Sequence, residues 1–409
     1  MKLVVISSAP IVKKEGQNFL YAPYEKEMQL WAKHADTIQF CCPIWQEDRK
    51  LLIAPISFQT EPTIELKEFD ITSLTNTLRA FPVVFVAMIK IFKAMKGADH
   101  IHLRCPGNMA LLASFVQILF PNKKKTAKYA GNWDPNSQQP WSYRLQKWIL
   151  SNTFLTRNMQ VLVYGEWPNQ TKNIKPFFTA TYSESEIQNS EFRIQNKLSL
   201  QSESITTESD FDFAQSDKKD NNSLSLRAES RTNENQFKFL FIGTLSPGKQ
   251  PLYAIQLVEE LYKKGLRVTL ELYGEGVLRK ELELYIAQNK LEPIVTLKGN
   301  QSKETVLKAY QSHHFLILPS KSEGWPKVVA ESMFWGCVPI ASPVSCVSYM
   351  MGNGSRGIIL KEQLDFDVNQ IINVLKNQEV YLKMSSEGQS WSRQFTTDKF
   401  EAEIRKLLK

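Results

Sequence analysis

The chain has 409 residues, of which 43% are hydrophobic and 22% charged, a composition typical of a soluble globular protein and a length that favours two domains. Its five cysteines are odd in number and show no C-x-x-C spacing, which argues for a reducing cytosol and against a disulfide framework or a structural zinc site. The formal net charge of +8 is concentrated in residues 1–182, where 22 Lys and Arg outnumber 13 Asp and Glu, so we expect an acidic partner. A phosphate-bearing substrate or an acidic membrane surface fits this charge, whereas no recognition helix, zinc finger or RNP-like motif indicates nucleic acid.

Residues 1–182 show alternating strand and helix patterns and predict a first domain built on a doubly wound parallel sheet. The first strand follows Met1 and Lys2 directly, without the apolar segment of a signal peptide, so we expect a cytoplasmic location. Ligands of such sheets bind at the carboxyl ends of the strands. The expected strands are Lys2–Ser7, Thr37–Cys42, His100–Arg104, Thr126–Tyr129 and Gln160–Tyr164, and the expected helices are Glu25–Ala35, Leu74–Lys96, Met109–Leu119 and Ser142–Ser151.

The apolar run Phe81–Ile89 lies inside one of these expected helices and is too short to span a bilayer. Lys90, Lys93 and Lys96 follow at helical spacing and form a basic edge beside the apolar face. One interpretation is an interfacial helix that lies on acidic lipid, which would place the protein peripherally on the inner membrane face. The other, which we favour, is a core helix whose lysines point into water.

Polar residues follow two of the expected strands. His102 and Arg104 project to the same face of their strand, where a histidine could act as a base and an arginine could bind phosphate, although a buried, hydrogen-bonded histidine is the more common case. Asn132, Trp133 and Asp134 follow Gly131 at the end of the next strand. These three residues either contact a sugar or form a structural turn, and the sequence does not distinguish the two.

Residues 183–236 differ in composition from the rest of the chain. They are rich in Ser, Asn, Gln and Glu, carry 6 Lys and Arg against 11 Asp and Glu, and lack a sustained apolar period. Such a segment has little to bury, so we expect a long, largely disordered linker or insertion.

A second domain is expected over residues 237–387. Three successive strands are each followed by a loop that contains glycine, and each loop leads into a helix. A single glycine pair after a strand is a weak signal, but three such units that open in the same direction predict a nucleotide-sized rim at one sheet edge. The loops are Gly243-Thr244, Gly274–Gly276 and Gly299-Asn300-Gln301.

The stretch 316–341 is the most informative part of the chain. It reads as a strand, a polar turn, a helix that begins near Pro326 and ends at Gly336, and a second strand. Glu323 lies in the turn and Glu331 in the helix, while the backbone amides of Lys327 and Val328 would offer an anion seat at the helix start. Two acids around an anion seat suit a nucleotide sugar, which has hydroxyl groups at both ends and phosphate in the middle. A surface helix with two solvated glutamates fits the pattern equally well.

Residues 388–409 form an amphipathic tail. Trp391, Phe395, Phe400, Ile404 and Leu408 can share one packing face of a terminal helix.

The stretch 316–341 resembles the E-x7-E signature of retaining glycosyltransferases of family 4, which have the GT-B fold. The resemblance rests on Glu323-Gly324-Trp325-Pro326, Glu331, Gly336 and Val338-Pro339-Ile340, and it extends over roughly residues 237–360. It implies an α/β protein with two Rossmann-like domains whose parallel sheets face each other across a cleft. It also implies that the last helix, within 388–409, crosses back to the first domain.

The resemblance also implies roles for individual residues. Glu323, with the amides of Gly324 and Trp325, should bind the donor sugar, and Glu331 should bind the ribose hydroxyls. Lys249 should bind the diphosphate, and Gly274, Gly276 and Asn300 should flank the base and ribose. The family has an arginine where this chain has Thr244, so Lys249 would carry more of the leaving-group charge, and Lys327 could compensate.

The first domain departs from the family in two places. Members often have a glycine pair after the first strand, where only Gly16 is available here, and a donor-contacting histidine where this chain has Asn132-Trp133-Asp134.

By the resemblance, the reaction moves a sugar from a nucleoside-diphosphate sugar to a saccharide or lipid-linked acceptor, without metal or other cofactor, in cell-surface polysaccharide synthesis. The D-x-D sequences at Asp210–Asp212 and Asp365–Asp367 lie outside the donor motifs. A sugar-nucleotide epimerase and a non-catalytic nucleotide-sugar-binding module remain as alternatives.

Overall fold

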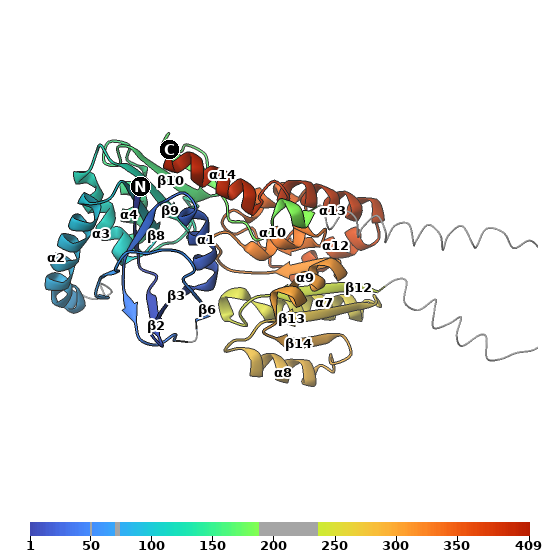
Figure 1. Cartoon of the computed structure of the whole chain (residues 1–409). Coiled ribbons are helices and arrows are strands. Elements are labelled where there is room, and N and C mark those ends of the chain that lie inside the picture. The colour runs from blue at the N-terminus through green and yellow to red at the C-terminus, as the bar shows by residue number, and fades with distance from the viewer. Residues whose placement is uncertain (50, 70–73, 188–235) are drawn as a thin grey trace, which may run out of the picture. The chain divides into compact units, whose positions relative to one another are not determined.

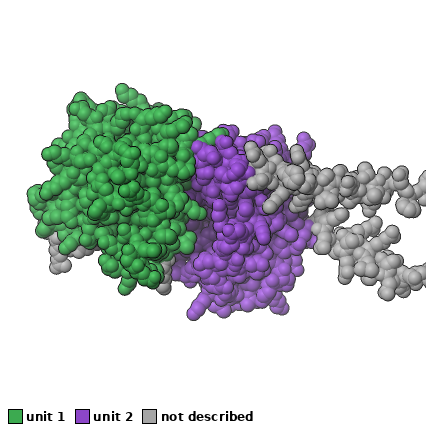
Figure 2. Space-filling view, in the orientation of Figure 1, with its two compact units in different colours: residues 1–179, 323–325, 399–409 green, residues 180–322, 326–398 purple. Residues whose placement is uncertain are grey.

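The computed structural model describes residues 1–49, 51–69, 74–187 and 236–409, so most of the expected linker 183–236 lies outside the described residues. The chain forms two compact units (Figure 2), and each is described by itself. Unit 1 contains residues 1–179, 323–325 and 399–409, and unit 2 contains residues 180–322 and 326–398. Among the described residues, none of the helices combines the length and the apolar character needed to cross a membrane.

Unit 1 is built on a seven-stranded parallel sheet with the order β11-β10-β9-β8-β1-β4-β7. The five strands expected from the sequence are confirmed, and the short edge strands β7 and β11 were not anticipated. Leu3, Val4, Val5 and Ile6 of the central strand β1 are fully buried, as expected for a parallel strand covered on both faces. The strands are β1 (Lys2–Ser7), β4 (Thr37–Cys42), β7 (Ile64–Glu65), β8 (His100–Cys105), β9 (Lys124–Tyr129), β10 (Met159–Tyr164) and β11 (Ile174–Phe177).

Three helices pack side by side on one face of this sheet: α2 (Leu74–Lys96), α3 (Asn108–Val116) and α4 (Trp141–Ser151) (Figure 1). A short 3-10 turn, η1 (Gln117–Leu119), extends α3. Helix α1 (Ala22–Ala32) contacts a different part of the unit, next to the smaller sheet. The four predicted helices of the first domain are therefore confirmed, with ends displaced by a few residues.

The last helix, α14 (Thr397–Leu408), belongs to unit 1 from residue 399 onward. The ring of Phe400 lies 5.2 Å from that of Phe177 at the end of β11, and Glu403 pairs with Lys175 at 2.5 Å. Trp391 and Phe395, which the sequence placed on the same packing face, belong to unit 2.

A four-stranded sheet that the sequence did not predict follows β1. Its order is β5-β2-β3-β6, and its strands are β5 (Ile44–Trp45), β2 (Ile11–Lys14), β3 (Gln17–Tyr21) and β6 (Ile53–Pro55). Gly16 lies in the turn between the antiparallel strands β2 and β3, with φ +76°. The segment after β1 therefore forms a hairpin instead of the expected glycine loop, and Gly16 serves the hairpin turn.

Unit 2 contains a six-stranded parallel sheet with the order β14-β13-β12-β15-β16-β17. Its strands are β12 (Phe237–Ile242), β13 (Val268–Tyr273), β14 (Val295–Gly299), β15 (Phe315–Leu318), β16 (Val338–Ala341) and β17 (Ile358–Ile359). Its helices are η2 (Pro247–Lys249), α7 (Pro251–Lys263), α8 (Arg279–Gln288), α9 (Lys303–Ser312), α10 (Lys327–Phe334), α11 (Val347–Met350), η3 (Gly352–Gly354), α12 (Leu364–Leu375) and α13 (Gln378–Ser392). The two parallel sheets confirm the predicted α/β class with two Rossmann-like halves.

Candidate functional site

The three glycine loops of unit 2 lie side by side at the carboxyl ends of their strands. The Gly243 N–H donates to the Tyr273 carbonyl at 2.9 Å, and the Gly274 N–H donates to the Gly299 carbonyl at 2.9 Å. These bonds join the loops after β12, β13 and β14 into one continuous edge. Because backbone amides and carbonyls hold the edge together, its shape depends little on the side chains of Thr244 and Asn300, which are exposed.

Two of these glycines are required by their surroundings. Gly274 has φ +140°, and a Cβ at this position would overlap the Gly243 carbonyl oxygen. A Cβ on Gly276 would overlap the Leu245 carbonyl oxygen in the same way. No side chain fits at either position, so the backbones of neighbouring loops can approach each other closely.

We expect Gly274→Ala to lower the free energy of unfolding by at least about 2 kcal/mol, because it adds both a strained φ and a clash with fixed backbone. Urea-induced unfolding would measure the change. Gly248→Ala is the matched control, since a Cβ there meets no atom within 4 Å. Equal stability of the two variants would contradict the close approach described here.

Lys249 ends the 3-10 turn η2, which follows the first glycine loop. This turn is tied to the loop after β15, because the Lys321 N–H donates to the Gly248 carbonyl at 2.9 Å. The side chain of Gln250 also donates to the Pro319 carbonyl at 2.6 Å. The loops after the neighbouring strands β12 and β15 therefore hold Lys249 in a defined backbone setting.

Helix α10 begins directly after Pro326, as the sequence predicted, and this N-cap residue makes no side-chain hydrogen bond to the first turn. Lys327 and Val328 occupy that turn, and both are partly exposed. The first amides of a helix and its dipole together attract negative charge. The start of α10 thus has the features of the predicted anion seat.

The carboxylate of Glu331 is held by two hydroxyl groups. Thr181 Oγ1 donates to one carboxylate oxygen at 2.7 Å, and the Tyr310 hydroxyl donates to the other at 3.1 Å. Tyr310 is fully buried; burial, and then the charge of Glu331, raise its pKa well above the usual value. Each carboxylate oxygen retains acceptor capacity, so a ligand hydroxyl can still bind Glu331. Neither partner stands out in the sequence, because each is an ordinary residue far from Glu331 along the chain.

Residues 323–325 belong to unit 1, where they lie near the carboxyl ends of β9 and β10. A Cβ on Gly324 would lie 2.6 Å from the carbonyl oxygen of Ala130, the residue that follows β9. Trp325 is 8% exposed, and its ring lies 5.7 Å from that of Tyr164 at the end of β10. Close packing of the two residues that follow Glu323 thus restricts the backbone that carries this carboxylate.

Asn132, Trp133 and Asp134 form a structural turn after β9. Trp133 is 2% exposed and packs edge-on against Tyr129 at 4.8 Å, and its indole N–H donates to Gln170 at 3.0 Å. The Asn132 side chain accepts from the Asp134 N–H at 2.9 Å, and the Asp134 side chain accepts from the Asn136 N–H at 2.8 Å. Of the two alternatives left open for Trp133, the burial of its indole in the core of the unit favours the structural turn.

Arg104 belongs to a buried ion cluster. Its guanidinium lies 3.4 Å from Glu27 and 3.9 Å from the ring centre of Tyr24, while Lys128 pairs with the same carboxylate at 2.8 Å. Burial alone would raise the pKa of Glu27, but Lys128 and Arg104 lower it to about 2. Arg104 is therefore occupied by a structural partner. His102 is likewise fully buried and bonded to Thr126 at 2.8 Å, and burial lowers its pKa to about 3.

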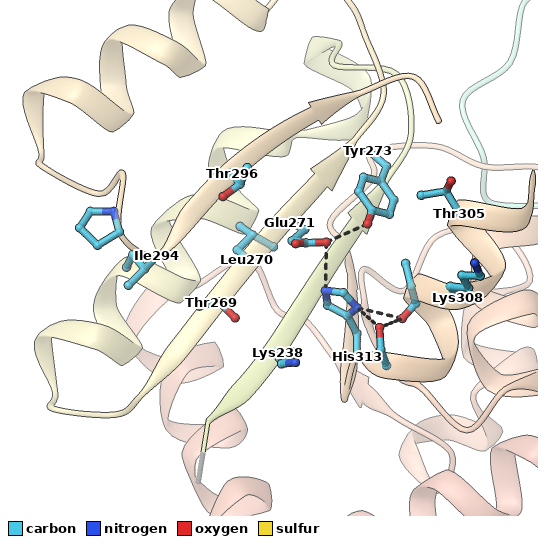
Figure 3. Close-up of a pocket in the computed structure, with 13 residues that line it drawn as sticks. Lys238, Thr269, Leu270, Glu271, Tyr273, Ile294, Thr296, Thr305, Lys308 and His313 are labelled. Atoms are coloured by element: carbon cyan, nitrogen blue, oxygen red, sulfur yellow. Dashed lines mark hydrogen bonds and ion pairs between the residues drawn. The ribbon is translucent and has the colours of Figure 1, made fainter. Parts of the chain in front are cut away.

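A separate pocket of about 320 Å³ lies between α9 and the sheet of unit 2 (Figure 3). At its centre Glu271 accepts from the Tyr273 hydroxyl at 2.8 Å and faces Nε2 of His313 at 3.5 Å. His313 Nδ1 donates to the Ala309 carbonyl at 2.8 Å, and burial lowers the pKa of the ring. The pocket extends to the amino ends of the strands, and its carboxylate is satisfied by protein groups. This pocket is therefore separate from the candidate site, which lies at the carboxyl ends of the strands.

The D-x-D sequences do not form a metal site within the described residues. Asp367 is fully buried; its oxygens accept from the Tyr253 hydroxyl at 2.7 Å and from the Lys361 N–H at 2.9 Å. Asp210 and Asp212 lie outside the described residues. Within the described ranges, no three His, Cys, Asp or Glu side chains are grouped so that they could hold a metal ion.

The glycine loops and α10 lie within a single segment of the chain that matches a known protein family. Residues 222–391 match the family model described as glycosyl transferases group 1. The chain is 27% identical over 169 residues to an uncharacterized glycosyltransferase of Methanocaldococcus jannaschii, covering 41% of this chain and 46% of that protein. It is 27% identical over 121 residues to the alpha-D-kanosaminyltransferase of Streptomyces kanamyceticus, covering 30% of this chain and 31% of that protein. The chain thus spans less than half the length of either relative.

The fold resembles solved structures over the whole chain. The HepE protein of Anabaena, crystallised with UDP and glucose, superposes with a TM-score of 0.62 at 14% identity and covers 100% of this chain and 98% of its own. At this level of identity the likeness establishes the fold alone.

Proposed function

We propose that the protein is a glycosyltransferase, because residues 222–391 match the family model of glycosyl transferases group 1 and the fold resembles that of HepE. It transfers a sugar from a nucleoside-diphosphate sugar to a saccharide or lipid-linked acceptor with retention of configuration. One observation carries the proposal: the hydrogen-bonded glycine loops after β12, β13 and β14 form a continuous edge at the carboxyl ends of the strands, the place where doubly wound sheets bind nucleotides.

The proposed roles follow from the local geometry and the family motif. The first-turn amides of α10, together with Lys249 and Lys327, stabilise the diphosphate as its bond to the sugar breaks. Glu331 binds the ribose hydroxyls, and Glu323 binds the donor sugar. The acceptor hydroxyl forms the new glycosidic bond, and its proton passes to the departing diphosphate. This route needs no paired acid and base in the protein, and because Thr244 replaces the family's arginine, Lys249 carries more of the leaving-group charge.

Nucleotide binding is the first test of this proposal. Thermal unfolding with UDP, GDP, ADP and dTDP should identify one nucleotide that stabilises the protein, and HepE makes UDP the first to try. A nucleotide at a hundredfold its Kd adds about 2.7 kcal/mol of stability. We expect Glu331→Ala to reduce the response of that nucleotide, because the ribose contacts are lost. No response to any of the four would contradict the nucleotide site.

Turnover of the donor, with and without an acceptor, distinguishes a glycosyltransferase from an epimerase and from a non-catalytic binding module. A glycosyltransferase releases free nucleoside diphosphate at a rate that depends on the acceptor. An epimerase converts the donor without an acceptor, and a binding module that has lost its chemistry binds nucleotide without turnover.

The acceptor side of the proposal includes contact with an acidic membrane, which suits a lipid-linked acceptor and a role in cell-surface polysaccharide synthesis. Helix α2 packs Ala87, Ile91 and Met95 into the core, yet its opposite side is apolar and exposed. The favoured expectation of a core helix whose lysines point into water is therefore incomplete, because apolar side chains of α2 are exposed as well. Exposed apolar side chains also occur on the neighbouring α3, η1 and α4 and in the loop after α4. Together with those of α2 we call them the exposed apolar face: Phe81, Phe85, Val86, Ile89, Phe92, Phe115, Leu119, Trp141, Trp148 and Phe154. Patches of this kind, with basic residues nearby, suit a lipid interface.

Vesicle sedimentation tests this contact. We expect Phe85→Glu to weaken binding to phosphatidylglycerol vesicles about tenfold or more, because an aromatic side chain leaves the interface and a negative charge replaces it. Leu284→Glu is the control, since Leu284 is 62% exposed on α8 of unit 2 and Phe85 is 60% exposed. Equal loss in both variants would contradict a role for the exposed apolar face.

A further inference from the structure

A second pocket lies in unit 1 at the amino ends of the strands, and we call it the amino-edge pocket. Its volume is about 560 Å³. Its walls come from the starts of β8, β9 and β10, the loops before them, the loop before β11, and the end of α14. The lining residues are His100, Asn122, Lys124, Lys125, Thr153, Thr156, Arg157, Asn158, Met159, Gln160, Lys172, Asn173, Lys406, Leu407 and Lys409.

The pocket is strongly basic. Among the described residues, six of its lining side chains are Lys or Arg and none is Asp or Glu. Arg157 and Lys172 are exposed and form no ion pair with any described residue. Lys125 is 2% exposed; burial lowers its pKa to about 8, and its ammonium donates to the Phe120 carbonyl at 2.9 Å. Lys406 is already paired with Glu403 at 2.7 Å, and Lys124 donates to the Lys409 carbonyl, so Arg157 and Lys172 offer the charge that a bound anion would neutralise.

One residue of the pocket wall is a buried histidine. His100 is 1% exposed, and its Nε2 is bonded to Thr126 Oγ1 at 3.0 Å. Its Nδ1 has no hydrogen-bond partner among the described residues. This nitrogen is closed off from solvent, so a phosphate oxygen could accept a hydrogen bond from it only in the tautomer with Nδ1–H and only after the pocket wall shifts.

From these features we propose that the amino-edge pocket binds a phosphate group. A phosphate ester carries several negatively charged oxygens, which match a cluster of Lys and Arg together with neutral donors. Thr153, Asn158 and Gln160 line the same pocket and supply hydroxyl and amide donors. The volume accommodates a phosphorylated headgroup or a diphosphate.

The amino-edge pocket is distinct from the residues proposed for transfer. It lies where β8, β9 and β10 begin, whereas Ala130 and Tyr164, which contact the segment 323–325, lie where β9 and β10 end. A strand of six residues spans about 20 Å, so a ligand in this pocket does not reach the carboxyl edge of the sheet.

Two sources could supply the phosphate: the headgroup of an acidic phospholipid or a soluble phosphate ester. The rim of the pocket adjoins the exposed apolar face. Phe154 is 71% exposed, and the Arg157 guanidinium lies 5.0 Å from its ring centre. Leu119, at 66% exposure, lies a few residues before Asn122 on the pocket wall. The lipid source therefore rests on the membrane contact proposed above, and the soluble source does not.

The test uses the full chain and two double variants. Arg157→Gln with Lys172→Gln removes two exposed cations of the pocket, and Lys280→Gln with Lys383→Gln removes two exposed lysines of unit 2 as a control. Calorimetric titration with inorganic diphosphate measures soluble phosphate binding. It is carried out in the Lys249→Gln background so that the proposed donor site contributes little. Sedimentation with phosphatidylglycerol vesicles, compared with phosphatidylcholine vesicles, measures binding to acidic phospholipid headgroups.

We expect the pocket variant to bind diphosphate about tenfold more weakly or worse, and the control to stay within about twofold. If vesicle affinity falls in parallel, the headgroup is the source; if it does not change, a soluble phosphate ester is the source. Absence of diphosphate binding in the Lys249→Gln protein, or equal binding by both double variants, would overturn the proposal. Because this readout needs neither a nucleotide nor turnover, a failure of the proposed glycosyl transfer would leave it interpretable.

Discussion

Glu323→Gln is expected to lower turnover at least about a hundredfold, the range found when one charge-stabilising group of an active site is removed. The amide keeps the shape of the carboxylate, so the close packing of Gly324 near Ala130 and of Trp325 near Tyr164 should persist. The negative charge is lost, and an NH2 donor replaces one of the two oxygens that can accept from the donor sugar. Acceptor-dependent release of nucleoside diphosphate measures the effect.

The controls for this variant separate the two glutamates of the motif. Glu281→Gln makes the same chemical change at an exposed position of α8 and should leave turnover unchanged. Glu323→Gln should retain the thermal response to the nucleotide, because Glu323 is assigned to the sugar, whereas Glu331→Ala should lose much of it. Turnover equal to that of the unmodified protein would remove Glu323 from its assigned role.

Glu27→Gln is expected to destabilise unit 1 by about 3–5 kcal/mol, the range for removing one partner of a buried ion pair. The Lys128 side chain is 1% exposed and the Arg104 side chain 19% exposed, and both lie against the Glu27 carboxylate. A neutral amide leaves these two cations buried without a compensating charge. Urea-induced unfolding measures the loss, and Glu65→Gln, at an exposed position of β7, should change stability by less than about 0.5 kcal/mol.

The pH dependence of stability follows from the same cluster. The pKa of Glu27 is about 2 in the folded chain, below its ordinary value of 4.5. A carboxyl group with a lowered folded pKa stabilises the protein above its unfolded pKa, and this contribution is lost as the pH falls through the folded value. Between pH 4.5 and 2 the unmodified protein should therefore lose stability more steeply than the Glu27→Gln variant. Parallel curves would show that Glu27 is not held by Lys128 and Arg104.

The sequence alone predicted the parts of the fold that depend on local pattern. Continuous apolar runs mark parallel strands that are buried on both faces, so the central strands of both sheets and the helices between them could be placed within a few residues. The glycine loops and the start of α10 were also predictable, because the conformations of glycine and proline are local properties. Their gathering at one sheet edge follows from the parallel arrangement of the strands.

Long-range packing decided the rest. The hydroxyl partners of Glu331 are Thr181 and Tyr310, and the sequence has no signal for either, since hydrogen-bond partners depend on which segments meet in space. The same holds for Arg104, whose partner Glu27 lies on α1, and for Trp133, whose burial is determined by its neighbours in the core. The hairpin around Gly16 was missed because its strands are short.

The exposed apolar side of α2 and the basic pocket show most clearly what the sequence determined and what the tertiary structure decided. The sequence by itself determined that α2 is apolar and that residues 1–182 are basic. Only the tertiary structure decided that one apolar side of α2 faces solvent and that cations from four chain segments line one pocket. Composition and periodicity report what a segment can bury, whereas the faces that are covered, and the charges that are brought together, depend on how all the segments pack.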